Sequence, residues 1–279
     1  MKVFIVDLSL CKGCYTCQIA CKDEHVGNDW LPYAKAQPLI GQFWLKMVEK
    51  ERGSYPKVKV TYYPYLCFHC DKAPCIPSCR VKAIYKRQDG LVIIDPVKCN
   101  GCRDCLYACP YDVIYFNENL NIAQKCTGCA HLLDKGDTPR CVDACPTEAI
   151  KFGEEEELKD LIQKASPLKP DLERVKPRVL YLHLELLKPF LTGAVYDPER
   201  DECIEGAKVT LTNTATGESL ETTTDIFGDF WFKGLQPSTY EVRIEKSGYY
   251  PIRIEKIKVE EDVNLGDLKM YQTPPATKT

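Results

Sequence analysis

Residues Cys99–Pro110 read CNGCRDCLYACP, which is the spacing C-x2-C-x2-C-x3-C-P without a departure. In this spacing the first three thiolates fall on one tight loop and can hold three corners of a cubane iron-sulfur cluster. The fourth thiolate lies on the turn that follows and ligates a neighbouring cluster instead. One such stretch therefore predicts a second one elsewhere in the chain.

The cysteine pattern occurs four times, as expected for a fold built from internal repeats. The first copy keeps the spacing of the third, the second has a longer middle gap, and the last has an eleven-residue gap. Together the copies use sixteen of the seventeen cysteines: Cys11, Cys14, Cys17, Cys21; Cys67, Cys70, Cys75, Cys79; Cys99, Cys102, Cys105, Cys109; and Cys126, Cys129, Cys141, Cys145.

Two other uses of clustered cysteines compete with clusters. A disulfide scaffold is disfavoured, because repeated C-x2-C pairs in a chain without an export signal are typical of metal binding. Zinc sites also use such pairs, but zinc ribbons do not combine a three-thiolate loop with a Cys-Pro exit. We therefore expect four [4Fe-4S] clusters, close enough for electrons to pass between them.

Crossed ligation, in which the fourth cysteine of one motif completes the cluster of another, assigns four thiolates to each cluster. The predicted sets are Cys11, Cys14, Cys17 and Cys145 (cluster 1); Cys67, Cys70, Cys75 and Cys109 (cluster 2); Cys79, Cys99, Cys102 and Cys105 (cluster 3); and Cys21, Cys126, Cys129 and Cys141 (cluster 4). The two central motifs then form one double-cluster unit, and the first and last motifs form the other. We expect an α+β ferredoxin-like domain of two pseudo-repeated double-cluster ferredoxin units over residues 1–153.

Other chemistry has little material in this chain. His69, inside the second motif, and His131, just after Cys129, are candidate hydrogen-bond donors to cluster sulfurs, with a packing or surface role as the alternative. No G-x-S-x-G, Walker or Rossmann motif is found. We therefore predict no catalytic residue here, and place any catalysis on another chain.

Composition and charge narrow the function classes. The chain has 279 residues, 44% hydrophobic and 28% charged, which is typical of a soluble globular protein of about two domains. A net charge of -3 and mixed lysines and acids argue against nucleic-acid binding. Because neither a membrane span nor a signal peptide is recognisable, we expect a cytoplasmic protein, with export attached to a signal-bearing partner left open.

An aromatic-rich insertion separates the first two motifs, at residues 22–66. We consider two interpretations. The rings cover the clusters against water, or they form a docking surface for a catalytic partner, since aromatic side chains are enriched in interface cores. The aromatic residues are Trp30, Tyr33, Phe43, Trp44, Tyr55, Tyr62, Tyr63 and Tyr65.

Residues 154–190 read as a helix followed by an extended arm. Leu158, Leu161, Ile162 and Ala165 recur at helical spacing, which predicts an amphipathic helix over 154–165 with the acidic run 154–157 as its solvated first turn. Alternating leucines at positions 180, 182, 184 and 186 then predict one continuous leucine face on an arm over 178–190. Such a face must be covered, either between the domains or by a partner.

From residue 191 to 274 cysteine nearly vanishes and short strands alternate with turn signals, which predicts a separate all-β domain of seven strands. The sequence resembles transthyretin-like or carboxypeptidase-regulatory-like modules at 205–211, 222–230 and 234–240, and implies an Ig-like sandwich. Docking or structural support is its expected role. Its lone Cys203 is expected to be a free thiol without a role. The expected strands cover 193–197, 206–212, 219–224, 228–232, 239–244, 252–259 and 264–270.

Motif order, the long gap in the last motif and the stretch Thr138–Gly153 carry a further resemblance, over residues 1–153. The chain resembles the iron-sulfur electron-transfer subunits of molybdopterin oxidoreductases of the dimethyl-sulfoxide-reductase family. Within this family it is most similar to small subunits of pyrogallol-phloroglucinol transhydroxylases, through residues 23–30, 51–56, 123–134 and 203–208.

The resemblance implies a large catalytic partner, in a heterodimer or a multiple of it, that holds molybdenum or tungsten on bis-pyranopterin guanine dinucleotide and acts on hydroxylated aromatics. An electron donor or acceptor protein is a further candidate partner. Transhydroxylase small subunits have lost part of the cysteine set, whereas this chain keeps sixteen. A complete set suggests net electron flow, so a hydroxylase, a dehydroxylase, a sulfur-compound or other anaerobic reductase, a freestanding polyferredoxin and a structural metal protein stay open.

Overall fold

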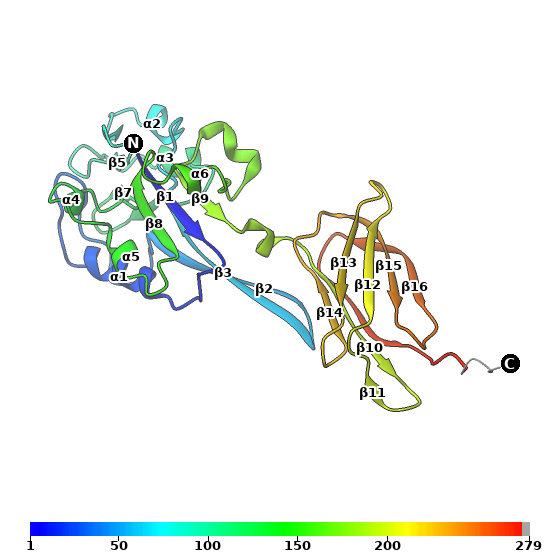
Figure 1. Cartoon of the computed structure of the whole chain (residues 1–279). Coiled ribbons are helices and arrows are strands. Elements are labelled where there is room, and N and C mark those ends of the chain that lie inside the picture. Colours follow the sequence, from blue (N-terminus) through cyan, green and yellow to red (C-terminus); the bar gives the residue numbers. More distant parts are fainter. Residues whose placement is uncertain (275–279) are drawn as a thin grey trace. The chain divides into compact units, whose positions relative to one another are not determined.

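The computed structural model describes residues 1–274 and separates into two compact units (Figure 1). Unit 1 comprises Met1–Glu49 and Thr61–Leu184, and unit 2 comprises Lys50–Val60 and the chain from Glu185 onward. The outer part of one hairpin thus belongs with the C-terminal third of the chain. The boundaries at 153 and 190 expected from the sequence remain predictions.

A three-stranded sheet organises unit 1. Its central strand β1 (Lys2–Asp7) pairs antiparallel with β8 (Ile150–Glu154) and parallel with β9 (Val179–Leu182), as Figure 1 shows. The four inner residues of β1 are all buried, so both faces of this strand are covered. The sheet therefore joins the two ends of the cysteine-rich region.

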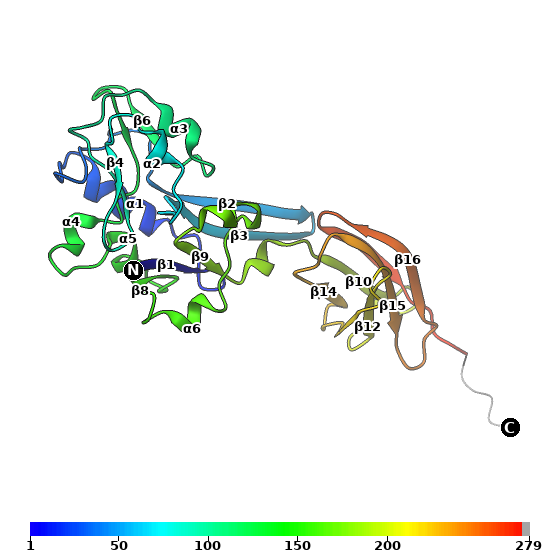
Figure 2. The ribbon, with the colours of Figure 1, turned by 90° about the horizontal axis from the view of Figure 1, so that it is seen from above.

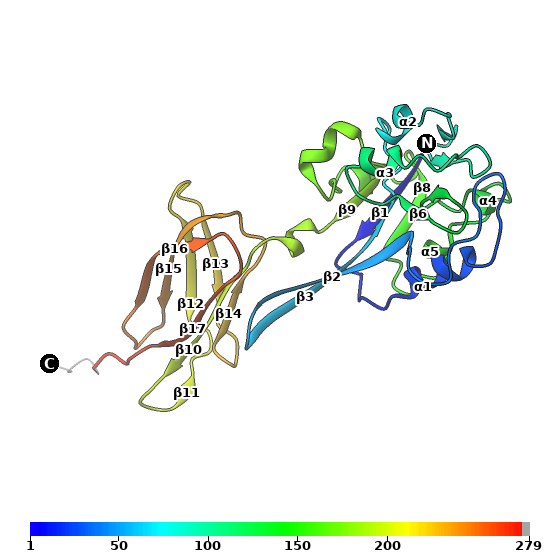
Figure 3. The same ribbon diagram turned by 180° about the vertical axis from the view of Figure 1, so that it is seen from behind.

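The cysteine motifs form short helices and hairpins around this sheet. Two short antiparallel hairpins accompany the central motifs: β4 pairs with β5, and β6 pairs with β7. Helix α1 contacts α5 and helix α2 contacts α3, pairs that Figure 3 also shows. The bounds are α1 (Thr16–His25), α2 (Cys75–Ser78), β4 (Ile84–Lys86), β5 (Val92–Ile94), α3 (Asp104–Ala108), β6 (Tyr115–Asn117), β7 (Ile122–Gln124), α4 (Ala130–Leu133) and α5 (Arg140–Asp143).

The helix expected over 154–165 is shortened to α6 (Lys159–Ile162). Glu154 instead ends strand β8 and forms ion pairs with the N-terminal amine and Lys2, while Glu155 pairs with Arg178. The acidic run is therefore not a solvated helix start. The apolar side chains at 158, 161, 162 and 165 do pack together, against Val3 and Ile5 of the sheet.

The extended leucine arm over 178–190 is also corrected. Only β9 is extended; the 3-10 helix η1 (Pro170–Val175) precedes it, and a second 3-10 helix, η2 (Leu184–Leu187), follows. Because β9 lies in the sheet, its other face carries the most buried side chains, Val179 and Tyr181. The sheet and α6 cover Leu180 and Leu182. These two leucines are therefore covered within unit 1 and not by a partner protein.

The insertion at 22–66 contains an irregular stretch and the hairpin of β2 (Leu45–Ser54) and β3 (Lys57–Leu66), visible in Figure 2. Trp44 is buried in unit 1, 1% exposed and against His25. Trp30, which is half-buried like most of the other rings, stacks on His131 at 4.2 Å between ring centroids. Tyr55, at the hairpin turn, is 92% exposed.

Unit 2 contains a sandwich of eight strands in two four-stranded sheets. The strand not expected is the two-residue β11, which pairs with the end of β10. Strand β17 pairs parallel with β10, and side chains such as Val209, Phe230 and Val242 form the core between the sheets. The strands are β10 (Leu191–Asp197), β11 (Glu202–Cys203), β12 (Lys208–Asn213), β13 (Ser219–Thr223), β14 (Asp229–Phe232), β15 (Ser238–Glu245), β16 (Ile252–Val259) and β17 (Val263–Lys269).

None of the helices within residues 1–274 has the length and apolar character needed to cross a bilayer.

Candidate metal centres

Glycine shapes three of the four cysteine loops. Gly13, Gly101 and Gly128 each stand one residue before the second cysteine of their motif, with φ between +63° and +76°. A Cβ at Gly101 would lie 2.5 Å from the Asn121 carbonyl oxygen, and one at Gly128 would lie 2.7 Å from Leu91. The loops therefore need a residue that tolerates the left-handed region and adds no side chain.

The fourth cysteines of the second and last motifs sit in the same kind of turn, whereas Cys21 of the first motif lies within α1. The Sγ atoms of Cys79 and Cys145 each accept a hydrogen bond, at 3.2 Å, from the backbone N–H four residues later, at Ala83 and Ala149. Backbone N–H groups aimed at sulfur stabilise the thiolate form and orient the side chain. Sequence spacing predicts the turn but not these donors.

Two groups of four thiols line one cavity each. One cavity, between the second and third motifs, is lined by Cys67, Cys70, Cys75 and Cys109, with Tyr111 and other rings around it. The other is lined by Cys79, Cys99, Cys102 and Cys105. The structure thus brings together the side chains of the second and third predicted sets.

Electrostatics relate the remaining eight thiols. Thiolate charge on Cys11, Cys145 and Cys14 contributes to the raised pKa of Cys17, after the larger effect of burial. In the same way Cys129, Cys21 and Cys126 contribute to the raised pKa of Cys141. These neighbours correspond to the first and fourth predicted sets.

Burial favours the protonated form of five of the grouped thiols. It raises the pKa of Cys17, Cys70, Cys75, Cys105 and Cys126 to about 12, with neighbouring thiolates adding to the effect. A metal group that binds thiolates here must therefore displace protons and supply compensating positive charge. Four sulfur donors around one cavity suit a thiophilic metal group.

Charge interactions between thiols of different sets, each smaller than the effect of burial on the same thiol, indicate a linear order of the sets. Cys105 raises the pKa of Cys75, Cys67 raises that of Cys126, and Cys17 raises that of Cys141. The third set is therefore next to the second, the second next to the fourth, and the fourth next to the first. Among the sixteen thiols only Cys14 and Cys102 are exposed, and they belong to the two ends of this series.

Polar side chains surround the fourth set, and of these the sequence singled out only His131, whose Nε2 bonds to Glu24. Glu24 accepts hydrogen bonds from Arg140 at 2.7 Å and from His131 at 2.9 Å. Burial alone would raise the pKa of Glu24, but these two hydrogen bonds and the charge of Arg140 together outweigh it and keep that pKa below its ordinary value. These residues come from motifs more than 100 positions apart, so spacing alone could not connect them.

Outside the thiols, the metal-binding potential is small. Within residues 1–274, no three His, Cys, Asp or Glu side chains converge at the distances of a single metal ion. Cys203 is exposed on β11, away from the other sixteen cysteines in sequence.

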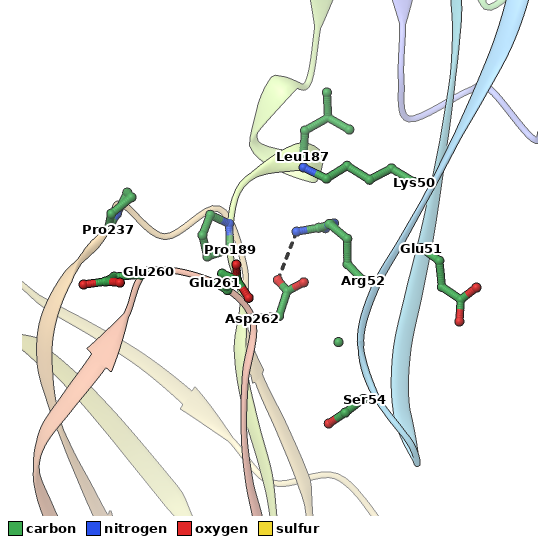
Figure 4. A pocket seen from close by; sticks show the side chains of 11 residues that line it. Lys50, Glu51, Arg52, Ser54, Leu187, Pro189, Pro237, Glu260, Glu261 and Asp262 are labelled. Carbon is green, nitrogen blue, oxygen red and sulfur yellow. Dashed lines mark hydrogen bonds and ion pairs between the residues drawn. The ribbon is translucent and has the colours of Figure 1, made fainter.

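A separate pocket lies in unit 2, between the hairpin tip and the sandwich (Figure 4). Arg52 of β2 lies at its centre, where its guanidinium pairs with Asp262 at 3.1 Å and also donates to the backbone oxygens of Leu186 and Lys188. Both charged side chains are only 10% exposed. Arg52 thus fastens the hairpin tip to the sandwich.

Comparison with known protein families identifies two regions. Residues 58–155 match the 4Fe-4S dicluster domain, and residues 191–270 match the carboxypeptidase regulatory-like domain. The first match confirms the expectation of iron-sulfur clusters, and the second confirms the expected class of the β domain. The arrangement in two pseudo-repeated units stays a prediction.

Similar proteins are subunits of larger enzymes. The sequence is 38% identical to the pyrogallol hydroxytransferase small subunit of Pelobacter acidigallici, over 88% of this protein and 90% of that one. It is 33% identical to the arsenate respiratory reductase iron-sulfur subunit of a Shewanella species, over 64% and 94%. It is 35% identical to the B subunit of the anaerobic dimethyl sulfoxide reductase of Escherichia coli, over 56% and 75%.

Proposed function

This protein belongs to the family of iron-sulfur subunits of molybdopterin oxidoreductases of the dimethyl-sulfoxide-reductase type, and from that membership we propose that it conducts electrons through four [4Fe-4S] clusters to or from a large catalytic subunit. The observation that carries the proposal is the grouping of sixteen thiols into four sets of four. A cluster bound to each set would supply one-electron transfer.

The linear order of the sets supports a wire. Cys102 and Cys14 expose the two end sets, whereas the inner sets contain no exposed cysteine. Electrons would therefore enter at one exposed end and leave at the other, with the inner groups shielded from solvent. One end would face the catalytic subunit, and the other a separate donor or acceptor.

For the partner we propose a large subunit with molybdenum or tungsten on bis-pyranopterin guanine dinucleotide, acting on hydroxylated aromatics. The similarity to a pyrogallol hydroxytransferase small subunit over 88% of this chain supports that substrate class. No catalytic residue is proposed on this chain, and a cytoplasmic location remains part of the proposal.

The retention of sixteen grouped thiols favours a second candidate, an anaerobic reductase or a redox-active hydroxylase or dehydroxylase. A transhydroxylation has no net redox change and needs no complete wire. Electron flow through the whole series would require a substrate that is oxidised or reduced overall.

The test is the metal content of the anaerobically purified native complex, per copy of this chain. We expect about sixteen irons, from four clusters of four, and one molybdenum or tungsten on a co-purifying large subunit. Sixteen irons on a lone chain would instead identify a freestanding polyferredoxin. Far fewer irons would contradict the four-cluster proposal.

A further inference from the structure

One of the four cysteine loops has histidine where the others have glycine. His69 stands one residue before Cys70, the position held by Gly13, Gly101 and Gly128 in the other motifs, and it keeps the left-handed conformation with φ +42°. A residue with a Cβ pays conformational energy there that glycine avoids. The side chain of His69 is therefore the feature to be explained.

The imidazole of His69 is buried with one nitrogen unused. Its Nδ1 accepts a hydrogen bond from the Val92 N–H at 3.0 Å, so in the neutral ring the proton lies on Nε2. The Nε2 atom has no hydrogen-bond partner within residues 1–274, although the side chain is 1% exposed.

A buried cation lies on the same cavity. Lys125 is 3% exposed, and its ammonium donates to the carbonyl oxygens of Val92 and, at 3.0 Å, Cys126. It forms no ion pair with a carboxylate in residues 1–274. Both His69 and Lys125 line the cavity of the second thiol set, Cys67, Cys70, Cys75 and Cys109.

Lys125 lies beside two neighbouring thiol sets. Lys125 lines the cavity of the second set, and its ammonium also donates to the backbone oxygen of Cys126, a member of the fourth set. The ammonium therefore lies near the junction of the two inner sets. An uncompensated buried cation is costly unless an anionic group balances it.

We propose that His69 and Lys125 are positioning residues that raise the reduction potential of the iron-sulfur group held by Cys67, Cys70, Cys75 and Cys109, His69 through an Nε2–H donor and Lys125 through its fixed charge. The inference rests on the proposed cluster function. A four-thiolate cluster gains one unit of negative charge when it accepts one electron, and no bond or proton is transferred. A nearby cation and a sulfur-directed hydrogen bond stabilise that added charge.

The contacts of His69 and Lys125 are also compatible with a purely structural role, without an effect on the potential. Lys125 satisfies two carbonyl oxygens, and His69 accepts one backbone N–H. A purely structural role predicts loss of iron or stability on substitution, with no selective change in potential. The potential of a fully loaded protein therefore distinguishes the two.

The experiment uses the anaerobically purified native complex with His69→Gly, Lys125→Met and Lys125→Arg. His69→Gly restores the residue of the other three loops, so it removes the donor while relaxing the backbone. Lys125→Arg keeps the charge. Lys164→Met, at an exposed lysine, controls for the loss of one positive charge anywhere in the chain.

Iron content and a redox titration followed by EPR are measured for each protein. We expect full iron throughout, a lower midpoint potential for one cluster in His69→Gly, and a lower potential in Lys125→Met. The potentials of Lys125→Arg and Lys164→Met should stay at the wild-type values. If Lys125→Met loses iron, Lys125→Gln keeps a donor without the charge and serves in its place.

Unchanged potentials in fully loaded His69→Gly and Lys125→Met would overturn the inference and leave the proposed function intact. Iron loss in both uncharged Lys125 variants, with an unshifted potential in His69→Gly, would also overturn it, because both residues would then be structural. Absence of clusters from the wild-type complex would instead overturn the proposed function itself.

Discussion

At the scale of residues, seventeen identical thiols differ only in their surroundings. The inner thiols, such as Cys70 and Cys126, are buried beside other thiols, which raises their pKa to about 12. Cys203 is exposed on the β domain. Burial favours the neutral thiol over the thiolate, so these sulfurs become thiolate ligands only when a metal group supplies positive charge.

Replacing one thiol from each environment tests this difference. We expect Cys70→Ser to lose or convert one cluster, with a loss of up to about four irons, because one of its four thiolate ligands is removed. Cys203→Ser should keep the full iron content. Iron analysis with EPR measures both, and a loss of iron in Cys203→Ser would contradict the assignment of this cysteine as a free thiol.

Asp197 provides a residue-scale pH dependence in the β domain. Burial alone would raise the pKa of the Asp197 carboxylate. The carboxylate accepts hydrogen bonds from the Gln272 amide at 2.8 Å, from the Tyr249 hydroxyl at 3.1 Å and from two backbone N–H groups. These bonds outweigh burial and leave the pKa below its ordinary value. A depressed folded pKa contributes stability above the unfolded pKa of about 4, and this contribution is lost as the pH falls through the folded pKa.

We therefore expect unit 2 to become less stable below about pH 4. Asp197→Asn should be less stable than wild type at neutral pH and show a weaker dependence on acid. Thermal unfolding of unit 2, followed by Trp231 emission between pH 3 and pH 7, measures the effect. An equally steep acid dependence in Asp197→Asn would show that other carboxylates control it.

The sequence predicts which cysteines gather but not what surrounds them. Spacing alone groups Cys67, Cys70, Cys75 and Cys109, and the structure brings these side chains to one cavity. That they ligate iron stays a prediction. Nothing in the pattern signals that Lys125 is buried, because lysine is normally exposed and only the surrounding tertiary structure supplies its carbonyl partners.

At the scale of elements, the outer part of the β2–β3 hairpin belongs to unit 2. Arg52 bonds to Asp262 and to two backbone oxygens, and Lys59 lies 4.4 Å from the ring centroid of Trp231. The ion pair of Lys57 with Asp229 adds a third attachment. A two-stranded ribbon is marginally stable by itself, so these contacts hold the tip in place.

Removing Arg52 should release the tip. Because Asp262 is 10% exposed, Arg52→Ala leaves a nearly buried carboxylate without its cation, at a cost on the order of 2 kcal/mol to unit 2. We expect a lower unfolding midpoint by Trp231 emission and faster tryptic cleavage between residues 50 and 60.

Arg253→Ala is the matched control. Arg253 forms a two-bond pair with Glu241 on the sandwich surface and is 61% exposed, so its loss should change little. Equal cleavage of the tip in Arg52→Ala and Arg253→Ala would mean that Arg52 does not fasten the hairpin.

Element prediction failed where long-range partners replaced local preference. The acidic run at 154–157 has helical spacing and favourable charge for a first turn, but Glu154 pairs with the N-terminal amine and joins β8. The alternating leucines suggested one buried face, yet β9 enters a sheet covered on both sides, which buries Tyr181 as well. Local patterns contain no information on such partners.

At the scale of the whole molecule, chain order and spatial order differ. The first and last cysteine motifs are far apart in sequence but meet through helices α1 and α5, and β1 and β8 join the ends of the same region. The crossed spacing of the cysteines anticipates this return of the chain. The assignment of Lys50–Val60 to unit 2 has no such signal, because its hairpin begins and ends in unit 1.

Deleting the sandwich tests whether the units are independent in function. All sixteen grouped cysteines lie in unit 1, and the cores of the two units contain different residues. A chain ending at residue 184 should therefore keep about sixteen irons, as four four-iron clusters require.

Residues 50–60 of the truncated chain should become sensitive to trypsin, because Asp262 and Trp231 are gone. Iron analysis and peptide mapping of the truncated chain, expressed with its large subunit, measure both, with the full-length complex as control. If iron falls while residues 50–60 stay protected, unit 2 stabilises the clusters and is not a separate docking or support module.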